Sequence, residues 1–203
     1  MSSDRSGSRA PLDTAEEIRL IAAAKHGDHA SFEALVDRYL KSAIAVAQGY
    51  VGNRDDAADM AQEAFYRVFK TLDRFRAGEP FAPWFFRILR NTCMNFCEKY
   101  RRKGHFSIQA GRDDGGDDYP LVGGELLPPD QAELHETQRM FWKALETLPL
   151  KHREILMLRH FEDLDYAGIA AVLEIPIGTV MSRLFHARQN LKKAMEPYME
   201  VPR

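Results

Sequence analysis

The sequence predicts an all-α protein made of two small helical domains joined by a flexible acidic linker. Apolar residues recur at three- and four-residue steps along most of the chain, and no stretch shows the two-residue alternation of a half-buried strand. Residues 104–130 break the helical pattern because they are rich in Gly, Pro and Asp. The 203 residues suffice for one or two domains, so two helical blocks with a tether fit the length.

The first block, residues 13–103, follows a polar tail at residues 1–12 and opens on a short helix. Thr14 and Glu17 form a capping-box pattern ahead of the first apolar residues, and Gly27 closes this helix.

Three further helices are expected in the same block. One apolar stripe occupies residues 32–50, and the helix after it can be capped by Asp55 or Asp56. A short loop at residues 75–81 precedes the fourth helix, where Pro83 fits the first turn.

The second block, residues 131–203, is expected to hold four more helices. Their expected ranges are 133–147, 151–160, 166–173 and 177–195. The last two are separated by Glu174-Ile175-Pro176, a break whose length is typical of a helix-turn-helix. An ordinary helical hairpin with a basic outer face is the alternative interpretation.

Composition excludes several protein classes. Two cysteines do not support a disulfide-rich scaffold, and no run approaches the roughly 20 apolar residues that span a bilayer. The first residues lack the apolar core of a signal peptide. We therefore expect a cytoplasmic protein without direct membrane insertion.

Charge is segregated along the chain even though the formal net charge is only −2. Residues 111–136 contain eight acidic residues and one Arg, whereas residues 87–103 contain six basic residues and one acidic residue. The basic segment predicts contacts with nucleic-acid phosphates, or alternatively a solvated helix end. Two partners of unlike charge are thus expected, with weak DNA binding by the chain alone.

Two sets of motifs resemble those of bacterial RNA polymerase sigma factors, in the extracytoplasmic-function class of the sigma-70 family. The second block carries Ala144-Leu145-x-x-Leu148-Pro149, Arg153-Glu154-x-Leu156-x-Leu158-Arg159 and Gly178-Thr179-Val180-x-Ser182-Arg183-Leu184-x-x-Ala187-Arg188. The first block carries Asp56-Ala57-x-Asp59-x-x-Gln62-Glu63-x-Phe65, followed by Phe75-Arg76, Phe81, Trp84, Arg87-Ile88 and Asn91. The resemblance covers roughly residues 14 to 195 apart from the linker, and it implies promoter-specific transcription initiation.

By this resemblance, an acidic helical face binds the clamp coiled coil of core RNA polymerase. Its expected residues are Asp56, Asp59, Gln62 and Glu63. An acidic face suits a basic partner because charge sets orientation and association rate. Asp55 and Asp56 have an alternative explanation, since acidic residues in a first turn stabilise the helix dipole.

The resemblance also places promoter DNA on both blocks. The expected −10 residues are Phe75, Arg76, Trp84, Arg87, Asn91, Arg101, Arg102 and Lys103, with Trp84 supporting the loop from the core. The expected −35 residues on the helix-turn-helix are Thr179, Met181, Ser182, Arg183, His186 and Arg188. Met181 and His186 stand where this class often has Arg or Lys, so we expect an altered or weaker −35 preference.

No enzyme, cofactor or metal signature is recognised in the sequence. Cys93, Cys97 and His105 suggest a metal or redox site, but zinc usually needs four well-spaced ligands, and Cys93 falls on an apolar face. A stand-alone helix-turn-helix regulator and a redox sensor remain the rival hypotheses. Family membership further implies an anti-sigma partner and no small-molecule substrate.

Overall fold

The computed structural model describes residues 14–76, 78–102 and 132–199, and its regular elements in these ranges are helical. They are α1 (Thr14–Lys25), α2 (His29–Val51), α3 (Arg54–Thr71), the 3-10 turn η1 (Leu72–Arg74), α4 (Phe81–Arg102), α5 (Ala132–Glu146), α6 (Leu150–Phe161), α7 (Tyr166–Leu173) and α8 (Ile177–Met199). The expected tail at 1–12, the linker at 104–130, Lys103 and His105 lie outside the described residues. The all-α class is confirmed.

Local capping explains where α2 begins and ends and where α3 begins. The Asp28 side chain accepts from the backbone N–H of Ala30 at the start of α2, and Gly52 ends the helix in the left-handed region at φ 86°. Asn53 caps α3 by accepting from the Asp56 N–H at 2.8 Å. The expectation of a cap at Asp55 or Asp56 is therefore wrong, because Asn caps a helix as well as Asp does and comes first after the glycine.

Helices α1–α4, which we call the first unit, enclose an aromatic core. The rings of Phe65 and Phe85 stack at 4.6 Å between centroids, and Phe85 meets Phe86 edge to face at 4.9 Å. Tyr39 of α2 lies 5.4 Å from Phe81 at the start of α4. Because Phe81, Phe85 and Phe86 are almost fully buried, they fix the position of α4 against α2 and α3.

Helices α5–α8 form the second unit, in which α7 and α8 make the expected helix-turn-helix. The helix directions change by 98° between α7 and α8, within the usual range for this motif. The Asp165 side chain caps α7 by accepting from the Gly168 N–H at 2.7 Å. Val180, Leu184 and Ala187 bury the inner face of α8.

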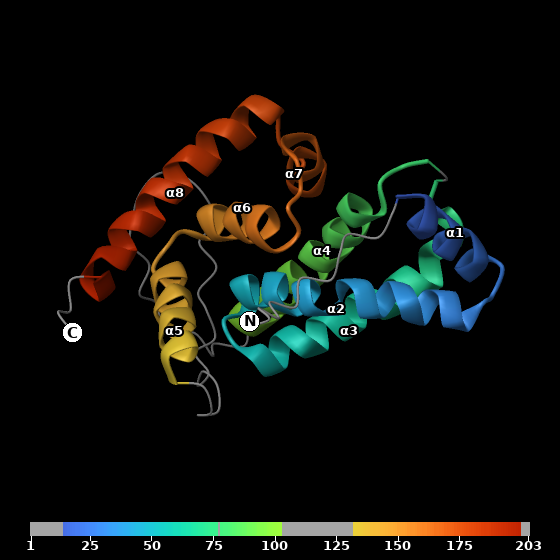
Figure 1. The fold of residues 1–203 in the computed structure, drawn as a ribbon, viewed down its shortest axis with the longest axis horizontal. Helices are drawn as coiled ribbons and strands as arrows, with labels where there is room; N and C mark the ends of the chain where they lie inside the picture. The colour runs from blue at the N-terminus through green and yellow to red at the C-terminus, as the bar shows by residue number, and fades with distance from the viewer. Residues whose placement is uncertain (1–13, 77, 103–131, 200–203) are drawn as a thin grey trace, which may run out of the picture.

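The two units pack directly against one another, so that one hydrophobic core runs through both. Figure 1 shows α6 beside α2 and α7 beside the start of α4. A Cβ built on Gly49 of α2 would lie 2.8 Å from Cγ of Met157, and one on Gly168 of α7 would lie 3.4 Å from Cγ of Pro83. Glycine at position 49 thus permits the close approach of α2 to α6, whereas the distance between position 168 and Pro83 is an ordinary contact distance. The sequence did not predict this packing of the two units.

Among the described helices, no single one is long and apolar enough to cross a membrane, although the bent pair of α7 and α8 together meets the same length and composition test.

Candidate nucleic-acid interface

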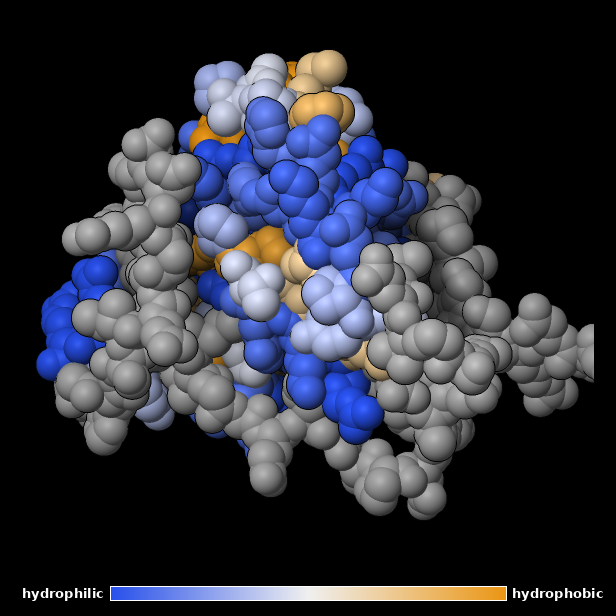
Figure 2. Space-filling view, turned by 90° about the vertical axis from the view of Figure 1, so that its left-hand side faces the viewer, coloured by the Kyte–Doolittle hydropathy of each residue, from blue (hydrophilic) through white to orange (hydrophobic). Residues whose placement is uncertain are grey.

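The outer side of α8 carries most of the residues expected to read the −35 element. Met181, Ser182, His186 and Arg188 are exposed, whereas Thr179 is half-buried. Phe185, which the sequence interpretation missed, is 58% exposed. It lies one helical turn after Met181, so periodicity alone could have found it. Figure 2 shows the side of the molecule that carries α5 and α8 as mostly hydrophilic, with apolar atoms in a hollow near its middle.

Arg183 departs from the expectation of an outward-facing phosphate contact. Its Nη1 donates to Oε1 of the buried Glu154 on α6 at 3.3 Å, and its side chain is only 21% exposed. The other carboxylate oxygen, Oε2, accepts from Arg90 Nε of α4 at 3.3 Å and from the Tyr50 hydroxyl of α2 at 3.3 Å. One carboxylate therefore joins both units.

Burial governs the electrostatics of this cluster. It raises the pKa of Glu154, while Arg90 and Arg183 act in the opposite direction. It also raises the pKa of Tyr50, which stays protonated and can donate to the carboxylate. A buried charge with two arginines and one hydroxyl has its oxygens satisfied, whereas loss of one partner leaves an uncompensated charge.

The loop before α4, which is expected to contact the −10 element, begins at an inward-facing aromatic residue. Phe75 is buried, with its ring centroid 5.0 Å from that of Trp84 and 5.7 Å from that of Phe81. Trp84 is half-buried in this group. Arg76 is exposed, with Nη1 3.8 Å from Oε1 of Glu79. The loop is thus anchored from beneath by its aromatic residues and presents polar groups to solvent.

The remaining −10 candidates lie along α4. Arg87 and Asn91 are exposed one turn apart, and Arg101 and Arg102 are exposed at the end of the helix. Arg102 pairs with Glu98 at 3.0 Å in an exposed contact of small energetic worth. The exposed side of α4 is therefore polar and basic, which suits contact with a phosphate backbone.

The four candidates for polymerase binding on α3 differ in how exposed and how paired their side chains are. Asp59 and Gln62 are exposed, while Glu63 pairs with Arg67 at 2.8 Å. Asp56 is half-buried and accepts from the Asn53 side-chain amide at 2.6 Å, so it also supports the start of α3.

Sequence reasoning missed two exposed aromatic residues on the same helix. Tyr66 is 57% exposed and Phe69 is 40% exposed. They follow Gln62 at helical spacing, which extends the candidate polymerase surface with the kind of side chain that is enriched in protein interfaces.

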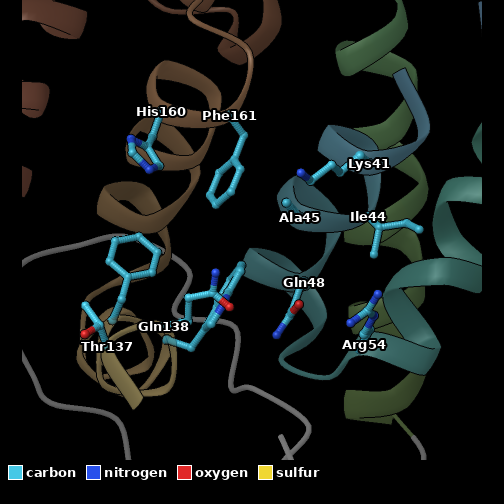
Figure 3. A pocket seen from close by; sticks show the side chains of 11 residues that line it. Lys41, Ile44, Ala45, Gln48, Arg54, Thr137, Gln138, His160 and Phe161 are labelled. Atoms are coloured by element: carbon cyan, nitrogen blue, oxygen red, sulfur yellow. The ribbon is translucent and has the colours of Figure 1, made fainter. Parts of the chain in front are cut away.

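A cavity of about 430 Å³ opens between the two units. Figure 3 shows Phe161 of α6 and Lys41 of α2 on facing sides of it, with Gln138 of α5 below and Arg54 of α3 at the opposite edge. Phe141 and Trp142 of α5 complete its apolar wall. The cavity exists only because the units are packed together.

The two cysteines are buried in the first unit. Burial raises the pKa of the Cys93 thiol, and it raises that of Cys97 to about 11. Both side chains are therefore thiols at neutral pH and poor nucleophiles. In the part of the chain that the structure describes, no three His, Cys, Asp or Glu side chains gather as a metal-binding group.

Comparison with known families matches both units. The model for sigma-70 region 2 matches residues 35–103, and the model for sigma-70 region 4 matches residues 138–191. The RNA polymerase sigma-H factor of Pseudomonas aeruginosa is 31% identical over 189 residues, which cover 93% of this chain and 98% of that protein. The ECF RNA polymerase sigma-E factor of Escherichia coli K12 is 32% identical over 183 residues, covering 88% and 93%.

Solved structures agree with these matches. The sigma factor RpoE of Bartonella quintana, solved with the anti-sigma factor NepR, aligns with a TM-score of 0.63 at 25% identity, covering 81% of this chain and 96% of that one. The fold of CnrH, solved with the cytosolic domain of CnrY, aligns with a TM-score of 0.64 at 22% identity, covering 90% and 98%. Two region models in order, together with relatives matched over nearly their full length, lead to one conclusion: the chain belongs to the sigma-70 family of RNA polymerase sigma factors, in its extracytoplasmic-function class.

Proposed function

We propose that this sigma factor uses three separate surfaces to direct initiation. The exposed side of α3 binds core RNA polymerase, the loop before α4 and the outer side of α4 bind the −10 element, and α8 enters the major groove of the −35 element. The observation that carries this assignment is the helix-turn-helix, whose second helix leaves Met181, Ser182, His186 and Arg188 exposed.

The chemistry of α8 favours a −35 element that is read with few guanine contacts. Arginine is the commonest specific partner of guanine, and Met181 stands exposed where the family often has a basic residue. A thioether cannot donate a hydrogen bond to a base edge, but it can pack on a thymine methyl group. Ile177 and Phe185 lie one turn before and after Met181 and are also exposed, which supports an apolar contribution to recognition.

Sigma-70 proteins are transcription initiation factors rather than enzymes. We infer that this chain likewise carries no catalytic activity and acts in the cytoplasm, where core polymerase is found. An anti-sigma factor is a further expected partner, because the RpoE relative was solved with one.

Capture of core polymerase tests the α3 assignment. Asp59→Lys reverses an exposed charge without touching the buried core, and we expect it to reduce capture of core polymerase by tagged protein at least about tenfold, since like charges across an interface are strongly unfavourable. The matched control is Glu33→Lys, the same change at an exposed position of α2, which should retain wild-type capture.

The same experiment distinguishes the rival function. A stand-alone helix-turn-helix regulator would bind duplex DNA without capturing core polymerase at all. Equal capture of core polymerase by Asp59→Lys and the wild type would show that α3 is not part of the polymerase-binding surface.

A further inference from the structure

The cavity of about 430 Å³ between the units has a cationic wall on the side of the first unit. Lys41 and Gln48 lie two turns apart on one face of α2, and Arg54 is the first residue of α3. Figure 3 shows these three side chains along the same side of the cavity. The volume is within the range of sites that hold small molecules.

The polar groups of the cationic wall are not used by other contacts. Within the described residues, Lys41 and Arg54 pair with no carboxylate, and none of the residues that line the cavity there is acidic. Gln48 is only 8% exposed, yet its side-chain amide makes no hydrogen bond within the same part of the chain. Because a buried amide is costly without a partner, this wall suits a ligand that brings negative charge and hydrogen-bond acceptors.

The opposite side of the cavity is an aromatic wall supplied by the second unit. Phe141 and Trp142 of α5 and Phe161 of α6 line it, and all three are half-buried. The rings of Trp142 and Phe161 stack at 6.1 Å between centroids, and Phe141 meets Trp142 edge to face at 5.7 Å. Since these rings already contact one another, a ligand would pack against the wall rather than between its members.

A planar aromatic acid matches both walls at once. A flat, rigid ring gains stacked or edge contacts with aromatic side chains and loses little conformational freedom on binding. A carboxylate on that ring can accept charge-assisted hydrogen bonds from Lys41 and Arg54 and a hydrogen bond from Gln48. An inorganic anion would leave the aromatic wall unused, whereas a neutral aromatic compound would leave the cations unused.

We propose that the cavity is a binding site for a small planar aromatic acid, which packs its ring against the aromatic wall and turns its carboxylate toward Lys41, Gln48 and Arg54. Because the two walls belong to different units, the bound acid stabilises the contact between them as its concentration rises. The site is separate from the promoter and polymerase surfaces proposed above and does not depend on them.

Isothermal titration calorimetry of the full chain with 2-naphthoate tests the site. Two analogues, 2-naphthylmethanol and 2-naphthylmethylammonium, keep the ring system and change its charge from −1 to zero and to +1. We expect one-to-one binding of the acid, with the alcohol at least about threefold weaker, because each exposed ion pair adds only modestly to affinity. The ammonium compound should bind at least about tenfold more weakly than the acid, since it faces like charges.

Variants of the lining residues test each part of the assignment. Lys41→Gln combined with Arg54→Gln should weaken 2-naphthoate about tenfold and leave the alcohol nearly unchanged. Arg19→Gln combined with Lys192→Gln is the matched control, because it removes the same charge at exposed positions that do not line the cavity. Ala45→Leu adds bulk at a lining position of α2, so it should weaken the acid and the alcohol alike.

Fluorine NMR locates the ligand independently of its affinity. The chain has two tryptophans, of which Trp142 lines the cavity and Trp84 does not. With 5-fluorotryptophan at both positions, 2-naphthoate should shift the Trp142 resonance and leave that of Trp84 in place, and Trp84→Phe assigns the two signals.

Three results would overturn the proposal. The first is the absence of 2-naphthoate binding, or equal affinity for the acid, the alcohol and the ammonium compound. The second is unchanged 2-naphthoate binding when Lys41→Gln and Arg54→Gln are combined. The third is a resonance shift confined to Trp84. Each of these results is independent of whether the chain supports transcription.

Discussion

At the scale of single residues, Glu174 carries local strain at the turn of the helix-turn-helix. It ends α7 at φ 56° and ψ 43°, and its N–H bonds to the Ala170 carbonyl. The left-handed region costs an L-residue on the order of 1–2 kcal/mol, and glycine is the usual solution at this position. The turn is therefore formed at some cost to stability.

Glu174→Gly should stabilise the fold by about 1 kcal/mol, because glycine relieves the strain but loses some chain entropy in folding. For a chain of this size the expected rise in Tm is about 2–4 °C, measured by circular dichroism. Glu174→Ala is the control, since it removes the charge near Arg90 but keeps the backbone strain. A Tm that falls with glycine, or rises equally with alanine, would contradict this explanation.

At the scale of elements, the helices could be read from the sequence because their signals are local. Stripes of apolar residues predicted the eight α-helices of the described residues in the right order. Gly52 ends α2 in the left-handed region, where glycine is the usual residue. The α8 helix continues past the expected end at residue 195 to Met199 and includes Pro197 in its last turn.

The side-chain partners within the candidate site could not be predicted in the same way. Periodicity showed which side of α8 is outward, but it could not reveal that Arg183 turns toward Glu154, 29 residues earlier, or that Arg90 reaches the same carboxylate from 64 residues away. Such pairings depend on tertiary packing. The burial of Phe75 likewise depends on Phe81 and Trp84 across the loop.

At the scale of the whole molecule, packing of the two units against one another should make stability respond to pH through Glu162. Burial raises the pKa of this carboxyl to about 7, a hydrogen bond from Ser42 and the nearby Arg38 oppose the shift, and Glu17 adds to it. A raised carboxyl pKa means that the folded, packed chain binds the extra proton. The contribution of Glu162 to stability is complete below pH of about 4.5 and is lost as pH rises through about 7.

The Tm of the chain, measured by circular dichroism, should therefore be lower at pH 8 than at pH 6. Glu154, whose pKa burial also raises, acts with the same sign. Glu162→Gln should flatten the response because it removes the titrating group while keeping a side chain of similar shape. A higher Tm at pH 8, or an unchanged response in Glu162→Gln, would show that other groups control the pH dependence of stability.

The packing of the two units against one another is the feature of the whole molecule that could not be predicted from the sequence. The linker composition indicated two tethered domains, and both units exist as expected. Their contact depends on a small residue, Gly49 of α2, because a Cβ there would lie 2.8 Å from Cγ of Met157 on α6. A single glycine in an apolar stripe does not reveal which distant side chain approaches it.

The most direct test of the whole account is mapping of transcription start sites on genomic DNA with purified core polymerase and this chain. We expect a set of new starts that share one −10 and one −35 sequence at constant spacing, with few guanine-dependent positions opposite Met181. These starts should disappear with Asp59→Lys and persist with Glu33→Lys. If core polymerase alone gave the same start sites, or if adding the chain gave no new start sites, the chain would not be a promoter-specificity factor.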